Sequence, residues 1–366
     1  MSAGRVKSKN LFNFQLQGFY DDDVAAHDAK TQQFSQSIDP KQSEHMQKLF
    51  AVNDEETNKE FVVMFRGFFD MMVKANVNQE PYTTANQNVD ETILKVSTNH
   101  CGDFEVPVFQ YTPKKFQDKS VKRAAYIYAH GGGGFALDAA TFKPALAYFA
   151  DELDVVVFNV DYRLAPETKC PNNVKDFYEA IKYVVKNADE LGIDARRIAI
   201  GGESGGGYIC LGAMVLLAQR EESALVRMAI VSIPMVDDYS FADVEPMTKE
   251  ERESAPMMRK IWKHLIADDW EKQKSDPLLF PGKASDELLQ KFVPTVLDTV
   301  EFDMYITEAT RLANRLRRAG RLLDQFVIPG GKHGSSHMPN MKCFTKAIEA
   351  RKLVFKNYLH DIKSQL

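Results

Sequence analysis

Short apolar runs of strand length alternate with longer stretches of helical periodicity over most of this chain. We predict strands at 92–97, 104–111, 124–129, 155–160, 197–200, 227–233, 294–299 and 324–328. We predict helices at 143–153, 174–188, 205–219, 307–319 and 340–360. Strands that alternate with helices form a mostly parallel sheet with helices on both faces, and the first two strands are expected to pair antiparallel. The predicted fold class is therefore α/β, with a sheet of eight strands.

Two regions interrupt this alternation. Residues 1–85 are polar and helical in pattern, and 238–280 form an insertion between two predicted strands. We expect both to form a helical cap over the carboxyl edge of the sheet, and residues 86–366 to form the main domain.

The stretch 61–75 within the first of these regions is apolar except for the charged residues Arg66, Asp70 and Lys74, and Gly67 interrupts it. These three charges lie four residues apart, so a helix would carry one charged stripe and a broad Phe/Met surface. Packed core is the simplest interpretation of such a helix. A lid or pocket wall, or a surface that rests on lipid, is the functional alternative.

The composition excludes several classes of protein. The 366 residues carry 46 Lys and Arg against 51 Asp and Glu, a net charge of −5, without the basic surface of a nucleic-acid-binding protein. The four cysteines are far apart, which predicts no zinc site and no disulfide framework and favours a reducing, cytoplasmic location. The N-terminus does not resemble a secretion signal, and no run is long enough for a membrane span.

A glycine-rich turn follows the apolar run 197–200 and precedes a helical pattern. Its sequence, Gly202-Glu203-Ser204-Gly205-Gly206, fits the G-x-S-x-G turn in which a serine side chain projects above a sheet. A phosphate-binding loop would need Lys and Ser or Thr next, but Gly207 and Tyr208 stand there. Ser204 is therefore a candidate nucleophile, and a plain glycine-rich turn is the alternative.

A second glycine-rich loop, His130-Gly131-Gly132-Gly133-Gly134, follows another apolar run. Glycines allow backbone N–H groups to approach the oxyanion that forms during acyl transfer. His130 is expected to order its own loop by hydrogen bonds rather than to act as a base.

A serine nucleophile needs a base and a carboxylate that orients the base. Asp298, Glu301 and Asp303 follow the apolar residues 294–297 and are the candidate carboxylates, while His333 follows the strand at 324–328. His333 and His337 have the i, i+4 spacing of metal ligands, but Gly334 disfavours a helix there, so we expect neither a metal nor a cofactor.

Together these motifs resemble the hormone-sensitive-lipase-like family of α/β-hydrolases. The motifs occur in the order of that family: the H-G-G-G loop at His130, Asp161-Tyr162-Arg163-Leu164-Ala165-Pro166-Glu167, the G-x-S-x-G turn, Glu301-Phe302-Asp303 and His333-Gly334. The resemblance implies an α/β-hydrolase fold over roughly 85–360. It also implies the site residues: Ser204 as nucleophile, His333 as base, Asp303 as its orienter, and the N–H groups of Gly132, Gly133 and Gly205 as the oxyanion hole. The fourth glycine of the loop, Gly134, leaves open which two loop amides face the oxyanion. The charges of Asp161–Glu167 are expected to hold the oxyanion loop by ion pairs.

The chain departs from the family at several positions. Gly205 stands where Ala is usual, which predicts a looser turn, and Glu203 where Asp is frequent; Met304-Tyr305 replaces Pro-Leu. The expected activity is hydrolysis of carboxylic esters with short to medium acyl chains through an acyl-enzyme. A receptor for a small molecule on the same scaffold and an amide deacetylase are the alternatives. The expected partner is a small-molecule ester, and a homodimer stays open.

Overall fold

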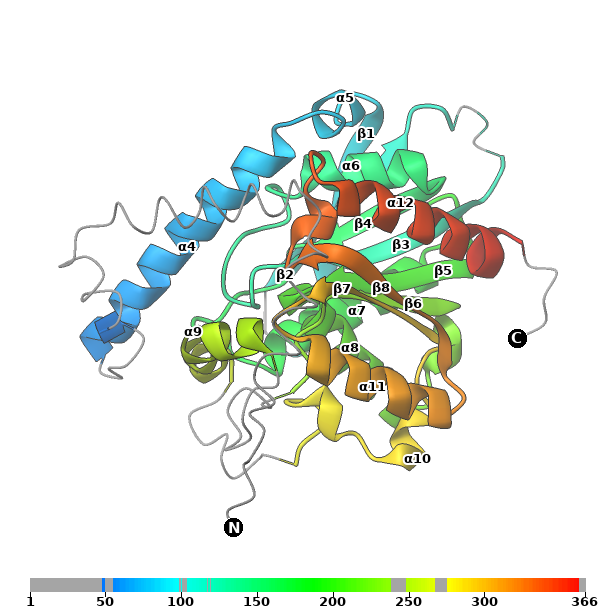
Figure 1. Ribbon diagram of the computed structural model, residues 1–366. Helices are drawn as coiled ribbons and strands as arrows, with labels where there is room; N and C mark the ends of the chain where they lie inside the picture. Colours follow the sequence, from blue (N-terminus) through cyan, green and yellow to red (C-terminus); the bar gives the residue numbers. More distant parts are fainter. Residues whose placement is uncertain are drawn as a thin grey trace, which may run out of the picture.

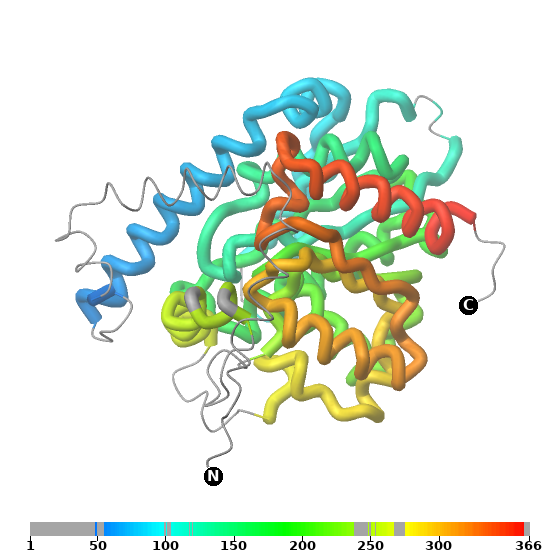
Figure 2. Tube along the Cα trace, in the orientation of Figure 1, coloured from blue at the N-terminus to red at the C-terminus, as the bar shows by residue number. Residues whose placement is uncertain are grey.

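The computed structural model describes residues 48–49, 55–98, 100, 104–116, 118, 120–237, 248–266 and 275–361. A central sheet lies between two layers of helices, with α4 (Glu55–Val77) projecting along one side (Figure 1). Figure 2 traces the same path and shows the α4 segment near the helix that follows residue 248. None of the helices in these ranges is long and apolar enough to cross a membrane.

The sheet has eight strands in the order β1-β2-β4-β3-β5-β6-β7-β8. Their bounds are β1 Val89–Ser97, β2 Glu105–Pro113, β3 Arg123–Ala129, β4 Val155–Val160, β5 Ile193–Glu203, β6 Met228–Ser232, β7 Thr295–Phe302 and β8 Leu322–Lys332. The β1/β2 and β2/β4 pairs are antiparallel, and every later pair is parallel. The predicted fold class and the eight predicted strands are confirmed, with ends that differ by a few residues.

Helices cover both faces of the sheet. Their bounds are α5 Tyr82–Ala85, α6 Lys143–Glu152, α7 Asn172–Lys186, α8 Gly205–Gln219, α9 Lys249–Leu265, α10 Asp286–Leu289, α11 Ile306–Arg318 and α12 Lys342–Val354, continued by a π-helical turn, η6 Phe355–His360. Short 3-10 turns lie at η1 Ser223–Leu225, η4 Pro281–Lys283 and η5 Ser335–His337. Figure 1 shows α6 and α12 on one face of the sheet and α7, α8 and α11 on the other.

Each face of the sheet has its own apolar core. On the α8 side, Phe177 and Leu211 pack with strand residues such as Ile200, and on the α6 side Phe149 packs with Tyr126. The helix α8 is buried from Gly205 to Ala218, which fits its nearly continuous apolar sequence. Parallel strands buried on both faces bring their carboxyl ends to one edge, where the loops after β3, β5, β7 and β8 meet.

The helix predicted around 61–75 is α4, and it begins earlier and ends later than predicted. This helix is more than packed core. Phe61 and Phe65 are buried, but the side chains of Val63, Phe68 and Met71 are 74, 50 and 62% exposed. The helix therefore has one face against the protein and one apolar face open.

The predicted insertion 238–280 contributes α9, and its parts 238–247 and 267–274 lie outside the described residues. The start of α9 is fixed by Thr248, whose side chain accepts from Glu251 N while the Glu251 carboxylate accepts from Thr248 N. This reciprocal cap satisfies two backbone N–H groups that a helix start leaves unpaired. It is a local signal, T-x-x-E, present in the sequence.

Candidate active site

The loop between β5 and α8 presents Ser204 at the edge of the sheet. Ser204 has a φ of 53°, in the left-handed region that residues with a side chain rarely occupy. The strain is held by backbone bonds, from Ser204 N to Ser232 O at 2.9 Å and from Tyr208 N to Ser204 O at 3.1 Å. A Cβ on Gly202 or Gly206 would lie 2.4 or 2.0 Å from backbone atoms, so both positions require glycine.

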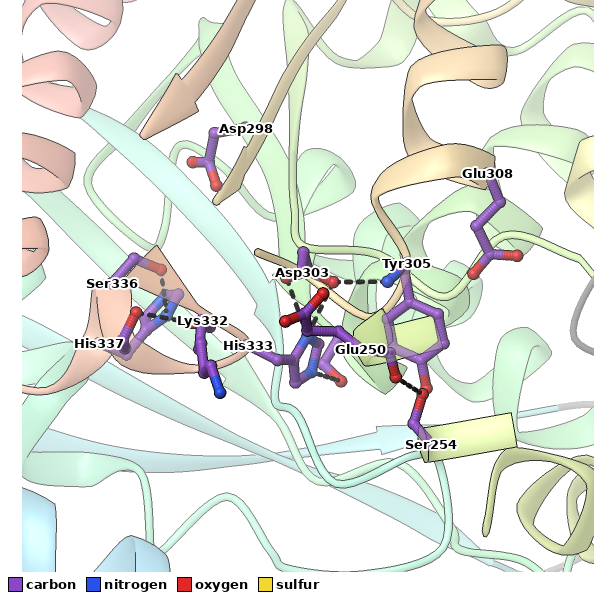
Figure 3. Close-up of polar contacts among 12 residues, drawn as sticks. Glu250, Ser254, Asp298, Asp303, Tyr305, Glu308, Lys332, His333, Ser336 and His337 are labelled. Atoms are coloured by element: carbon purple, nitrogen blue, oxygen red, sulfur yellow. Dashed lines mark hydrogen bonds and ion pairs between the residues drawn. The ribbon is translucent and has the colours of Figure 1, made fainter. Parts of the chain in front are cut away.

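The side chains of Ser204, His333 and Asp303, which are far apart in the sequence, are connected by hydrogen bonds. His333 Nε2 lies 2.9 Å from Ser204 Oγ, and His333 Nδ1 lies 3.1 and 3.0 Å from the two carboxylate oxygens of Asp303. Asp303 is fully buried. Figure 3 shows Asp303 and His333 side by side at the ends of their strands. Because Asp303 accepts from Nδ1–H, Nε2 is left with a lone pair for the serine hydroxyl.

The two other candidate carboxylates have different partners. Asp298 accepts from Ser232 Oγ at 2.9 Å and from Arg351 Nε of α12 at 3.0 Å, and all three side chains are buried. Glu301 accepts from Gly330 N at 3.0 Å. In Figure 3 Asp298 lies well apart from His333. Of the three candidates, only Asp303 contacts the histidine.

Tyr305 is a further contact of this group. Its N–H donates to Asp303 Oδ1 at 2.8 Å, and its ring meets the His333 imidazole edge to face at 5.2 Å between centroids. Its hydroxyl contacts Met258 of α9. The Met304-Tyr305 departure from the family pattern thus places an aromatic side chain between the histidine and α9.

The glycine loop after β3 lies directly against Ser204. The amides of Gly132, Gly133 and Gly205 make no hydrogen bond in the stretches of chain that the structure describes. A Cβ on Gly205 would lie only 2.4 Å from Gly133 N, so the loop and the start of α8 are in close contact. The missing Cβ of Gly205 is what lets the loop approach the turn, and the expectation of a looser turn stays a prediction.

Burial and stacking hold the loop from behind. His130 is fully buried, its Nδ1–H donates to Gly131 O at 2.8 Å, and its ring stacks on Tyr162 at 4.4 Å between centroids. Burial lowers the pKa of His130, so the ring stays neutral. The Tyr162 hydroxyl donates to His130 O at 2.7 Å. The expected loop-ordering role of His130 agrees with these contacts.

The segment Asp161–Glu167 holds the loop differently from the prediction. Asp161 Oδ1 accepts from the backbone of Ala139 at 2.9 Å, which is not an ion pair. Glu167 does form an ion pair, but with Arg66 of α4, which also donates to Phe135 O at 2.8 Å. Sequence reasoning missed this role of Arg66. The available signal was an arginine in the charged stripe of an otherwise apolar stretch.

A cavity of about 100 Å³ opens at Ser204. Its walls are mostly apolar and come from α4, α6 and the loops after β3, β5 and β8, with Phe69, Met72, Val73, Phe142, Leu146 and Phe149 among them. Ser204 and His333 line the same cavity. The pocket-wall interpretation of α4 therefore has direct support from its position.

His337 lies beside this group without joining a metal-ligand set. Its Nε2 lies 2.6 Å from Glu203 Oε2, while His333 contacts Ser204 and Asp303. The described part of the chain holds no group of three or more His, Cys, Asp or Glu side chains suited to a metal ion. Cys170, Cys210 and Cys343 are buried free thiols; Cys101 lies outside the described residues.

Comparison with known proteins agrees with this geometry. Residues 126–337 match the sequence profile of a family with the α/β-hydrolase fold. Hormone-sensitive lipase of Mus musculus is 34% identical over 113 residues, which are 31% of this chain and 15% of the lipase, so the chain spans a small part of that relative. Ethyl acetate hydrolase of Pseudomonas putida is 27% identical over 237 residues, 64% of this chain and 72% of that protein.

The structure is also similar to solved esterase structures. A bacterial heroin esterase superposes with a TM-score of 0.71 at 29% identity, covering 80% of this chain and 90% of the esterase. The matched family profile includes both glycine loops and reaches His337, but its last residue precedes α12. The segments before residue 126, including α4, lie outside the profile.

Proposed function

Since the chain belongs to the hormone-sensitive-lipase-like family of α/β-hydrolases, we propose that it hydrolyses carboxylic esters of short to medium acyl chain through an acyl-enzyme on Ser204. The observation that carries the proposal is the hydrogen-bonded line from Asp303 through His333 to Ser204, which ends in a cavity. A receptor that only binds a small molecule has no need of this alignment, so the geometry favours the enzyme.

The first half of the reaction forms the acyl-enzyme. His333 Nε2 takes the proton of Ser204 Oγ as this oxygen attacks the ester carbonyl carbon. Asp303 holds the imidazole in the required tautomer and stabilises the imidazolium. The N–H groups of Gly132, Gly133 and Gly205 donate to the oxyanion, and His333 then gives its proton to the leaving alcohol.

Water completes the cycle. His333 removes a proton from a water molecule, which attacks the acyl carbon; collapse of the second oxyanion returns the proton to Ser204 Oγ and releases the carboxylic acid. The same groups serve twice, so loss of any one of them affects both halves of the reaction.

The size of the cavity supports the acyl-length preference. About 100 Å³ is well below the roughly 300 Å³ at which pockets for drug-sized ligands begin. The walls are mainly Phe, Met and other apolar side chains, which suit an alkyl chain and adapt to its shape. The proposed cap consists of residues 1–85 together with the insertion around 238–280, and its described helices include α4, α5 and α9.

Two finer features belong to the same proposal. A cytoplasmic location is supported by the three buried free thiols, because oxidising compartments favour disulfides. A homodimer remains a hypothesis that sedimentation of the purified protein would test.

Two measurements test the proposed function. A series of p-nitrophenyl esters should show hydrolysis that is highest for short acyl chains and falls steeply beyond about ten carbons, because the cavity is small. A fluorophosphonate probe should label Ser204, and Ser204→Ala should lose both labelling and turnover. Labelling elsewhere, or strong activity only on emulsified long-chain triglyceride, would contradict the proposal.

A further inference from the structure

A second acid and histidine pair lies beside the proposed triad. Glu203 immediately precedes Ser204, and His337 is four residues after His333. The atoms Glu203 Oε2 and His337 Nε2 are 2.6 Å apart, and the two side chains are only 9 and 13% exposed. Both line the cavity that Ser204 lines. None of the proposed chemical steps uses this pair.

The Glu203 side chain also contacts the oxyanion loop. A Cβ added to Gly131 would lie 3.3 Å from both Cγ and Oε1 of Glu203, which places the carboxylate against the first glycine of that loop. A buried carboxylate at this place is unfavourable for the reaction, because the oxyanion that forms nearby carries the same charge in a medium of low dielectric. The negative charge of Glu203 therefore needs compensation.

Two other buried carboxylates at this edge of the sheet have a basic partner. Asp303 faces His333, and Asp298 faces Arg351 at 3.0 Å. The pKa of Glu203 is raised by burial, but His337, Arg351 and His333 together outweigh that effect and hold it below its usual value. His337 is the one among these three that lies at ion-pair distance from Glu203.

His337 is itself held in place by its neighbours. Its carbonyl accepts from the Tyr82 hydroxyl of α5 at 2.9 Å, and its N–H donates to Gly334 O at 3.0 Å. Its Nδ1 lies 3.2 Å from Ser336 Oγ. The pair thus joins the turn that bears Ser204 to the loop that follows His333.

We propose that His337, which lies 2.6 Å from the Glu203 carboxylate, compensates the charge of Glu203 beside the oxyanion and so acts as a positioning residue for ester hydrolysis, an inference that rests on the function proposed above. In this role it touches neither the substrate carbonyl nor Ser204. Its contribution is electrostatic, because it keeps the field of Glu203 from opposing the charge that develops in the transition state.

The test is a double-mutant cycle on the intact chain. His337→Gln should lower kcat on the order of 10²-fold, the effect of losing one oxyanion-stabilising interaction, because it leaves Glu203 unpaired. Adding Glu203→Gln to that variant should restore most of the loss, since the unpaired charge is gone. His360→Gln, a matched change at a histidine that bonds Leu153 O far from the site, should leave kcat unchanged.

Rescue separates charge compensation from a purely structural role. If the pair only braced two loops, the double variant would be as slow as His337→Gln or slower, and that result would overturn the proposal. The rate constant for fluorophosphonate labelling of Ser204 gives the same comparison without an ester substrate. A wild-type protein that labels but hydrolyses no ester would therefore contradict the proposed function and still test the pair.

Glu203→Gln alone covers the case in which His337→Gln does not fold. With the carboxylate gone there is no charge left to compensate, so kcat should fall by far less than the order of 10²-fold expected for His337→Gln. A loss of about 10²-fold in Glu203→Gln would overturn the proposal.

Discussion

The carboxyl edge of the sheet and the helices α4 and α9 are held to the molecule by different kinds of contact. At the edge, backbone meets backbone: Gly205 leaves no room for a side chain against Gly133 N. The helices use mainly side chains, as where Phe61 of α4 stacks on His264 of α9 at 5.4 Å and on Phe135 at 6.0 Å, although Leu265 O of α9 also accepts from Cys170 N at 2.8 Å. Backbone contacts fix atoms to within fractions of an ångström, whereas side-chain contacts can repack.

This difference separates two kinds of effect. Changes at the edge should act on kcat, because they move or remove groups that meet the reacting atoms. Changes in the helices should act on KM, acyl preference or stability, because these helices wall the cavity and hold the loop from outside. The four predictions that follow test this separation, from the largest expected effect to the smallest.

The largest effect is expected for Asp303→Asn. Without the carboxylate, His333 loses the partner that sets its tautomer, and kcat should fall on the order of 10⁴-fold, the size known for this change in the serine-protease template. Steady-state kinetics on a short-chain ester measures it. Glu301→Gln is the matched control, because Gln can still accept from Gly330 N and should stay near wild-type activity.

A smaller loss is expected for Gly205→Ala. The new Cβ would lie 2.4 Å from Gly133 N, so the oxyanion loop must move, and a displacement of about 1 Å costs on the order of 10²-fold in kcat. Gly67→Ala in α4 is the control, because a Cβ there meets nothing within 4 Å. Wild-type kcat in Gly205→Ala would show that the edge repacks as easily as the helices.

Arg66→Met tests how α4 holds the oxyanion loop. The variant loses donors to Phe135 O and Ala165 O and the ion pair with Glu167, and KM should rise about tenfold with a smaller change in kcat. Lys74→Met, which breaks only the exposed pair with Asp70, should change neither constant. A fall in kcat at constant KM would mean that Arg66 acts on the reacting groups at the carboxyl edge of the sheet rather than on the walls of the cavity.

The smallest effect concerns acid sensitivity at the contact between α4 and α9. Burial, aided by Lys260, Lys169 and Arg66, lowers the pKa of His264 to about 4. In the unfolded chain a histidine titrates near pH 6.5, so the unfolded state binds a proton first as pH falls. This contribution to stability is complete above about pH 6.5 and is lost as pH falls toward 4.

His264→Phe keeps an aromatic ring against Phe61 and removes the titration. Urea unfolding at several pH values should show that the unfolding free energy of the variant falls less steeply between about pH 6.5 and 4. The difference in slope should correspond to at most about one proton bound on unfolding. Parallel curves for the two proteins would mean that His264 is accessible to protons in the folded state.

The strands and the site motifs could be predicted because their signals are local. A buried parallel strand needs a short apolar run, as at Val155–Val160, and the sharp turn at Ser204 needs glycines within two residues of it. Strand ends were less accurate. The strand β5 begins at Ile193, four residues before the predicted run, because Asp194, Arg196 and Arg197 are polar strand residues without an apolar pattern.

The partners of Arg66 and Glu203 could not be predicted in the same way. Arg66 bonds groups 69 and 101 residues away, and a charge on a helix has the same sequence pattern whether it meets water or a loop. The Glu203 and His337 pair depends on how two loops from different strands meet. His337 was interpreted by its spacing to His333, and spacing along the chain carries no information about this contact.

The sequence by itself determined the alternation of strands and helices and the glycine turns, since each depends on residues close together in the chain. Only the tertiary structure decided which of three carboxylates faces His333, and that α4 forms a wall of the cavity. It also decided that Gly205 lets the loop at Gly133 lie close to the start of α8. The physical reason is that these outcomes depend on distances between segments. Such distances follow from the packing and twist of the whole sheet, which no local pattern encodes.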